Sequence, residues 1–337
     1  ASAHFHAGHA AYRQKIMAPC LNEDCFIPLG PLRAQVPRLD CLVSVTYFAI
    51  TGAGLRVWID YIVGTQSLDF LGLRGRGNGC SGTHIDGSGF FFQNILGCVI
   101  IAAAQEYKAE LGAATYAGIG AGLCGSLTTF ASWMEYQALA ILQGKYLDAI
   151  AVFLGMLGAS YCAHMFGKLL AHPRKWVRGF EEQAEEDDVF TACGKSSATM
   201  WILCISAYVA SAAIGLGIAI WLGVVGEWED LVAMGCAPLG ALSRYILSLG
   251  NPKCPQFPIF TLAANLLGCL VYIGADAFEK GFVQYGSDWG DEVVSAAATG
   301  IGGCLSTVST FINELRNKSI HAPNRLLYAF VSFAAAL

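Results

Sequence analysis

The sequence predicts an all-α polytopic membrane protein, built from two inverted four-helix repeats joined by a linking transmembrane helix. Hydrophobic residues make up 55% of the 337 residues and charged residues only 13%, whereas soluble domains carry about a quarter charged residues. A nine-residue stretch also occurs twice in related form, at 125–133 and 303–311, each time inside an apolar segment. An internal duplication of this kind is typical of membrane transport proteins.

Roughly nine apolar stretches lie along the chain, each close to the ~20 residues that a bilayer requires. They predict membrane helices over residues 41–63, 89–105, 113–140, 147–170, 199–226, 231–249, 257–278, 292–314 and 324–337. We therefore expect an N-terminal tail (1–40), a first repeat (41–171, the first half), a polar linker (172–198), a linking helix (199–227) and a second repeat (228–337, the second half). Because one helix lies between the two repeats, the second repeat is expected upside down relative to the first.

Positive charges predict the orientation of these helices. When the N-terminus is placed in the cytosol, only five of the 20 Lys and Arg residues fall on the outer side: Arg56, Arg74, Arg76, Lys145 and Lys280. The remaining fifteen lie on the cytosolic side, as the positive-inside rule requires. We therefore expect the C-terminus of the ninth stretch to be extracellular.

Polar residues recur at matched positions of the two halves. Asn94 in the second stretch corresponds to Asn265 in the seventh. An unpaired amide in hydrocarbon is costly, so each asparagine must face a partner or a wet cavity. For each asparagine taken alone, contact between helices is an equally good interpretation. The matched positions of the two residues favour a shared site. Arg56 and Arg244 also match, and we expect them to snorkel to the interface or to hold a helix interface.

The duplicated stretch predicts a broken helix in each half. Gly125 and Gly303 lie three residues before Thr128 and Ser306. A break at these positions frees backbone carbonyls, and a cation buried where the two breaks cross could bind them. Close helix packing explains a single glycine equally well. It explains less well the hydroxyl and aromatic residues that follow both glycines.

The remaining residue types exclude several classes of function. No spacing indicates a catalytic metal or an acyl-transfer site, so we expect no enzyme. The net charge of −5 comes largely from the linker and gives no reason to expect nucleic acid. A small inverted-repeat cation or drug exporter is the alternative, although no carboxylate lies centrally in the first or sixth stretch. Amides, hydroxyls and aromatic edges present positive polarity, which suits a small hard anion.

The glycine–arginine segments, the matched asparagines and the run Thr128–Trp133 resemble the Fluc (CrcB) fluoride channels. The duplicated form with a linking helix is similar to the eukaryotic fluoride exporters (FEX) of that family. The resemblance implies passive export of fluoride across the plasma membrane by a single two-repeat chain in a lipid bilayer. It also implies a structural Na⁺ held by carbonyls of Gly125, Thr128, Gly303 and Ser306.

The resemblance further implies which residues bind fluoride. One pore would pair Phe130 with Phe311, and the fluoride-binding residues would be Asn94, Phe130, Asn265, Ser309, Thr310 and Phe311. The other pore would pair Val308 with Trp133, so it lacks the first ring. We therefore expect one functional pore and one degenerate pore.

Overall fold

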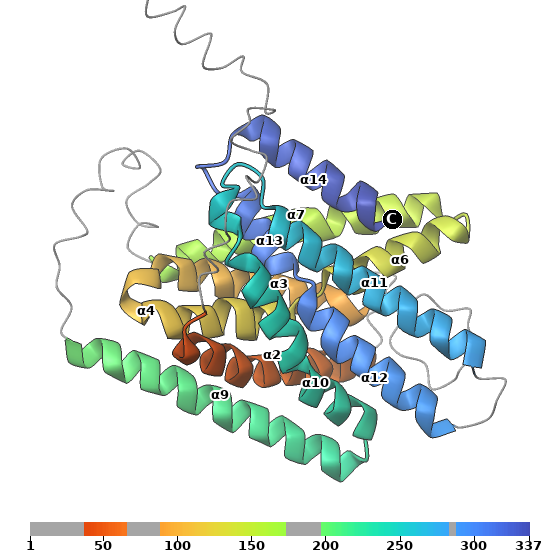
Figure 1. Cartoon of the computed structure of the whole chain (residues 1–337), viewed down its shortest axis with the longest axis horizontal. Helices are drawn as coiled ribbons and strands as arrows, with labels where there is room; N and C mark the ends of the chain where they lie inside the picture. The colour runs from red at the N-terminus through yellow and green to blue at the C-terminus, as the bar shows by residue number, and fades with distance from the viewer. Residues whose placement is uncertain (1–36, 66–87, 173–196, 283–287) are drawn as a thin grey trace, which may run out of the picture.

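The computed structural model describes residues 37–65, 88–172, 197–282 and 288–337, and the regular structure within these ranges is helical (Figure 1). Four of the described helices are long and apolar enough to cross a membrane: Leu39–Val63, Tyr146–Ala171, Cys204–Val225 and Trp228–Lys253. Two shorter apolar helices accompany them, Phe90–Glu106 and Ile259–Ala275. The prediction of a helical polytopic membrane protein is confirmed at this level. The N-terminal tail and most of the polar linker lie outside the described residues.

The first half contains one long interruption of a helix. In chain order its elements are α2 (Leu39–Thr65), α3 (Ser88–Glu106), α4 (Lys108–Ala117), the π-helical segment η3 (Gly118–Cys124), α5 (Gly125–Leu127), α6 (Phe130–Leu142) and α7 (Tyr146–Ala171). The predicted third stretch, 113–140, is therefore divided among four elements. A π-helical segment widens the turn and is often found at functional sites.

The rest of the chain forms one further long helix, α9, and then a second helical series with fewer interruptions. Its elements are α9 (Ser197–Val225), α10 (Trp228–Ser248), the short 3₁₀ turn η6 (Asn251–Lys253), α11 (Ile259–Phe282), α12 (Asp288–Leu305), α13 (Val308–Leu315) and α14 (Ala322–Ala336). The predicted eighth stretch, 292–314, is divided at Ser306–Thr307 into α12 and α13. The helix breaks that the duplicated sequence predicts are thus present in both halves.

Matched glycines bring helices together in the two halves. A side chain at Gly52 of α2 would clash with the carbonyl of Leu123 in η3, and one at Gly240 of α10 would clash with the carbonyl of Ile301 in α12. Accordingly α2 packs along η3, and α10 packs along α12. Small residues permit this close backbone approach in membrane helices.

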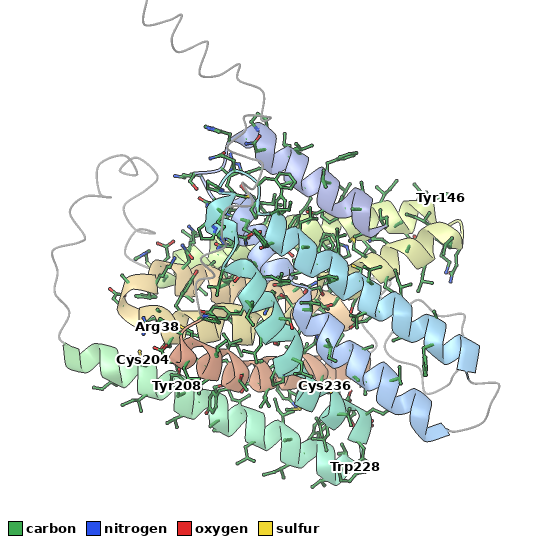
Figure 2. The ribbon with its side chains drawn as sticks, in the orientation of Figure 1. Arg38, Tyr146, Cys204, Tyr208, Trp228 and Cys236 are labelled. Atoms are coloured by element: carbon green, nitrogen blue, oxygen red, sulfur yellow. The ribbon has the colours of Figure 1, made fainter. Side chains whose placement is uncertain are left out.

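The helix α9 lies along one side of the molecule, next to α2 (Figures 1 and 2). Hydroxyl groups connect the two helices: Tyr47 donates to the carbonyl of Tyr208, and Thr51 bonds to Ser211. The opposite face of α9 is apolar and exposed, with Val209 and Val224 as examples. In a bilayer this face can contact lipid tails without cost.

Candidate functional site

The two helix breaks have the same local conformation. Thr128 and Thr129 are extended between α5 and α6, and Thr307 is extended between α12 and α13. The side chain of Thr129 accepts from the amide of Ser132, and that of Thr307 accepts from the amide of Thr310. Each threonine therefore caps the helix that follows its break.

The two breaks cross each other through their hydroxyl groups. Thr128 Oγ1 lies 3.1 Å from Thr307 Oγ1 and 3.2 Å from Ser309 Oγ. Ser306 Oγ accepts from the amides of Phe130 and Ala131, at 3.2 and 3.1 Å. Segments separated by about half of the chain are thus joined at one buried polar crossing.

Each matched asparagine makes two hydrogen bonds, here called a bracket, to one threonine at the break in its own half. Asn94 Oδ1 accepts from the amide of Thr129 at 2.8 Å, and Asn94 Nδ2 donates to the carbonyl of the same residue at 3.2 Å. Asn265 makes the same two bonds to Thr307, at 2.7 and 3.4 Å. Both asparagines are fully buried. The sequence analysis expected each buried side-chain amide to face a partner or a wet cavity, and the partner is the backbone of the break. A role of the asparagines in fluoride binding stays a prediction.

The four residues predicted to hold a cation have carbonyls that lack their usual helical donor. The amides four residues ahead donate elsewhere: Thr129 to Asn94, Ser132 to Thr129, Thr307 to Asn265, and Thr310 to Thr307. The carbonyl of Gly303 accepts a long bond, 3.5 Å from Ser306 Oγ. Carbonyl oxygens released in this way suit a hard cation such as Na⁺. The residues present therefore fit the implied ion.

The matched arginines are buried and reach from one half to the other. Arg56 is 5% exposed and Arg244 is 3% exposed, so the expectation that they snorkel to the interface is wrong. Arg56 donates to the carbonyl of Thr299 at 2.9 Å, and its guanidinium faces Gly303. Arg244 donates to the carbonyl of Ala121 and faces Gly125. The alternative expectation, that they hold an interface, agrees with these contacts.

Aromatic rings gather beside the crossing. The centroids of Phe130 and Phe311 are 5.6 Å apart, and both side chains are fully buried. Phe333 of α14 contacts both rings, at 5.6 and 5.4 Å, and also lies 5.2 Å from Trp133. The predicted pair is therefore in contact, but Trp133 belongs to the same cluster and is not separated from it. Phe333 was missed because nothing in its own sequence context marks it.

The sequence analysis also missed a carboxylate close to the rings. Glu314 accepts hydrogen bonds from Thr261 at 2.7 Å and from Tyr328 at 2.8 Å, and Tyr328 packs 5.3 Å from Phe311. Asn251 donates to the same carboxylate at 3.3 Å. The spacing of three residues between Phe311 and Glu314 places both on one helix face, which was a usable signal.

The predicted hydroxyl residues differ in their surroundings. Ser309 is fully buried; its Oγ donates to the carbonyl of Cys124 at 3.3 Å. Thr310, the next residue, is only partly buried and lies in the first turn of α13. The structure thus brings Asn94, Phe130, Asn265, Ser309 and Phe311 to one region. In the described part of the chain, no three His, Cys, Asp or Glu side chains gather as metal ligands.

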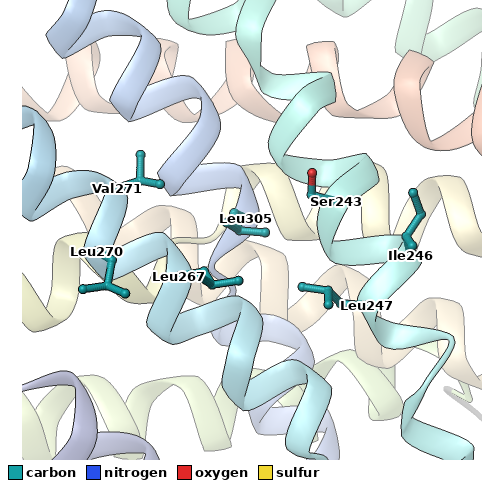
Figure 3. A pocket seen from close by; sticks show the side chains of 7 residues that line it. All are labelled: Ser243, Ile246, Leu247, Leu267, Leu270, Val271 and Leu305. Atoms are coloured by element: carbon teal, nitrogen blue, oxygen red, sulfur yellow. The ribbon is translucent and has the colours of Figure 1, made fainter.

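A groove of about 590 Å³ lies between α10, α11 and α12, and its lining includes Leu305, the residue before Ser306 (Figure 3). Its lining is apolar apart from one hydroxyl: Ser243, Ile246, Leu247, Leu267, Leu270, Val271 and Leu305. Several of these side chains face outward, including Leu270, which is 61% exposed. Such a surface suits lipid tails better than a hydrated ion.

Three known proteins are similar to parts of this chain. Fluoride export protein 1 of Neurospora crassa is 27% identical over 222 residues, which cover 59% of this chain and 42% of that protein. Fluoride export protein 1 of Candida albicans is 26% identical over 266 residues, 68% of this chain and 64% of that protein. The fluoride-specific ion channel FluC of Pasteurella multocida is 40% identical over 92 residues, 27% of this chain and 68% of that protein.

The matches to the two fungal proteins span less than two thirds of the length of either. No solved structure matches the chain. The family of CrcB-like proteins (Camphor Resistance, CrcB) matches residues 43–168 and 231–337, which include both helix breaks. The resemblance that the motifs indicated is confirmed, and the chain belongs to the CrcB-like family.

Proposed function

We propose that this protein is a fluoride-selective channel, and not an enzyme, that lets cytosolic fluoride leave the cell passively. The observation that carries the proposal is the contact between Phe130 and Phe311 beside a buried crossing of hydroxyl groups. Ring edges and hydroxyl hydrogens present positive polarity to a small anion that has lost its water. The names of its fungal and bacterial relatives agree with fluoride as the ion.

Two inverted repeats with α9 as the linking helix form the proposed framework. The bracketing asparagines, the glycine contacts and the arginine contacts each occur once in both halves, which supports a duplication. One chain then contains both breaks, so a single two-repeat chain suffices for a pore. Phe130 and Phe311 line the functional pore. The residue that the family resemblance would pair with Trp133 is Val308, which has no ring, and this supports a degenerate second pore.

We place the protein in the plasma membrane, with the N-terminus in the cytosol and the C-terminus outside. Hydrogen fluoride crosses membranes as a neutral acid and dissociates in the cytosol, where the anion is trapped. An inside-negative potential supplies ~2.3 kcal/mol per charge per 100 mV, which drives the anion outward through a passive pore.

Carbonyls of Gly125, Thr128, Gly303 and Ser306 would hold a structural sodium ion, which would supply a fixed positive charge shared by the two breaks. The two guanidinium groups already lie beside Gly125 and Gly303, so the carbonyls must offset three positive charges. Replacing sodium by a large organic cation should lower fluoride flux with no sodium current in its presence. Flux that is coupled stoichiometrically to sodium would contradict a structural ion.

Purified protein in liposomes provides the main test. Vesicles loaded with fluoride and given a potassium ionophore should lose fluoride rapidly, and chloride-loaded vesicles should lose almost none. Vesicles without protein and vesicles with Phe311→Ile protein are the controls. Equal loss of the two halides would contradict the proposal.

Glu314 is the one observation that favours a coupled transporter, because a carboxylate that contacts the ring cluster through Tyr328 can exchange a proton. This second candidate predicts that a pH gradient changes the protein-dependent fluoride flux at a fixed membrane potential, after subtraction of the flux in protein-free vesicles, which neutral hydrogen fluoride carries. Flow through a passive pore follows the membrane potential and the fluoride gradient, so the pH gradient should leave the protein-dependent flux unchanged. The same vesicles therefore distinguish the two mechanisms.

A further inference from the structure

The helix α13 carries Phe311 and is too short to hold its own position. It contains eight residues, Val308–Leu315, and the extended residue Thr307 separates it from α12. Isolated helices of this length are marginal, and most helical stability in proteins comes from packing. The contacts at the far end of α13 therefore help to decide where the Phe311 ring lies.

Two side-chain contacts join the end of α13 to the neighbouring helix α7, which belongs to the first half (Figure 1). His164 Nε2 on α7 lies 3.0 Å from Asn313 Oδ1, and the guanidinium carbon of Arg316 lies 4.4 Å from the centre of the Tyr161 ring. The two residues on each side are three apart, so each pair lies on one helix face. A guanidinium over a tyrosine ring adds a cation–π attraction. We call these two contacts the α7–α13 latch.

The helix α7 is a firm base for this latch because it is tied closely to α3. A side chain at Gly167 would clash with the carbonyl of Val99, so the two helices approach backbone to backbone. Glu106 at the end of α3 lies 3.1 Å from both Lys168 Nζ and His172 Nε2. Since α3 also supplies the asparagine bracket of the first half, the latch connects α13 to the frame of that half.

Packing alone does not account for a histidine at position 164. The His164 side chain is fully buried, and its Nδ1 has no hydrogen-bond partner in the described part of the chain. Leucine would fill a similar volume without a buried polar atom left unsatisfied, which costs free energy. Asn313 Oδ1 can only accept, so Nε2 carries the proton of the neutral ring and donates. The bond to Asn313 is thus the contact that a histidine makes here and a leucine cannot.

We propose that the latch positions Phe311 against Phe130, and that His164 and Asn313 are its positioning residues. The inference rests on the proposed function and names the residues that align its ring pair. Asn313 follows Phe311 by two residues on the same short helix, and the centroids of the two rings are 5.6 Å apart. A site that replaces the water around an anion needs its groups at fixed positions, so loss of the latch should lower both flux and selectivity.

The latch is complemented on another face of α13 by Glu314. Its carboxylate accepts from Thr261 of α11 and from Tyr328 of α14, both in the second half. α13 also packs along α3, where Ile312 belongs to the same apolar cluster as Cys98. Apolar packing is non-directional, whereas the latch is a directional link from the end of α13 to the first half.

Hydrogen exchange of the full-length protein in detergent tests the latch without requiring transport. We expect His164→Leu to raise the exchange rate of the α13 amides several-fold, because a helix with fewer contacts opens more often. His164→Gln should restore slow exchange, since its amide can still donate to Asn313. His172→Gln is the matched control on α7: His172 contacts Glu106 of α3, so exchange in α13 should not change. Unchanged α13 exchange in His164→Leu would overturn the latch.

Fluoride and chloride efflux from liposomes tests the positioning role. His164→Leu should lower fluoride flux several-fold and also lower the ratio of fluoride to chloride flux, and His164→Gln should restore both. Asn313→Ala should cause the same loss, and the double variant should lose no more than either single one, because the two side chains act through one bond. Losses that multiply, or no rescue by glutamine, would overturn the role. If His164→Leu does not fold, Asn313→Ala decides by the same two measurements.

The two measurements separate this proposal from the channel itself. An unmodified protein that conducts no fluoride would contradict the channel, and the exchange of α13 would still decide the latch. Fluoride flux in the unmodified protein, with equal flux in the His164 and Asn313 variants, would leave the channel standing and contradict the positioning role.

Discussion

Glycine at the two helix breaks is required by contact and not by backbone conformation. The glycines with positive φ are Gly112, Gly144 and Gly226 among the described residues, and none of these is at a break. Gly125 and Gly303 instead leave space for the guanidinium groups of Arg244 and Arg56. Their role is therefore steric, and substitution by alanine tests it directly.

Gly303→Ala should destabilise the protein by about 1–3 kcal/mol, because the added methyl group meets Arg56 in a packed interior. Gly274→Ala in α11 is the control, since nothing lies within 4 Å of the position that its methyl group would occupy. Thermal unfolding of both purified variants gives the comparison. A Gly303→Ala protein as stable as the control would show that Arg56 moves aside freely.

Phe311→Ile should remove most fluoride flux while the protein still assembles, because isoleucine fills volume but has no ring edge to present. Phe48→Ile replaces an equally buried ring in α2 and should leave most flux in place. Flux is measured in liposomes, and size-exclusion profiles report assembly. Similar flux in both variants would remove the special role of the ring pair.

At the scale of single residues, the sequence identifies those site residues that recur in both halves or whose partners are close in the chain. The asparagines, glycines and Phe311 were found in this way. Phe333 was not, because its importance depends on the approach of α14, which no local pattern specifies. Glu314 was not either: its spacing from Phe311 was a signal, but its partner Thr261 lies on α11. The burial of Arg56 and Arg244 was missed for the same reason, since it depends on contacts with the opposite half.

Broken helices need a neighbouring helix to satisfy their backbone. α3 supplies Asn94 to the break between α5 and α6, and α11 supplies Asn265 to the break between α12 and α13. Each bracket gives a partner to one amide that the helix no longer pairs, and the asparagine also donates to the carbonyl of the same threonine. The break is therefore a property of two elements together.

Asn265→Ala should lower stability by about 1–3 kcal/mol, because it leaves the buried amide of Thr307 without a partner. Asn317→Ala, which affects only surface contacts with Ser319, is the control and should be nearly neutral. Thermal unfolding measures both. If the two variants unfold at the same temperature, water or another group replaces the bracket.

The division into elements was predicted only in part. Apolar length locates the long helices well, because a bilayer sets that length. It does not show where a helix ends inside a stretch, and the π-helical segment η3 had no signal beyond its glycines. In the structure Arg244 donates to the carbonyl of Ala121 in this segment, and α2 packs along it.

For the whole molecule, orientation is the property that most needs a direct measurement. An epitope inserted in the Gln143–Lys145 turn, between α6 and α7, should be accessible to antibody on intact cells. An epitope in the 317–320 turn, between α13 and α14, should require permeabilised cells. Fluoride efflux from the tagged cells shows that each insertion is tolerated. The reverse pattern would place the N-terminus outside.

The reciprocal arginine contacts have a consequence for how a duplicated chain can diverge. Two copies of a repeat usually accumulate substitutions independently, and the matching positions 130 and 308 carry different residues, Phe and Val. Arg244 and Gly125 belong to different copies, as do Arg56 and Gly303. Neither copy can lose its member of such a pair without a compensating change in the other. Among homologous two-repeat chains, each arginine and its glycine should therefore be inherited as a unit, even where the rings are not.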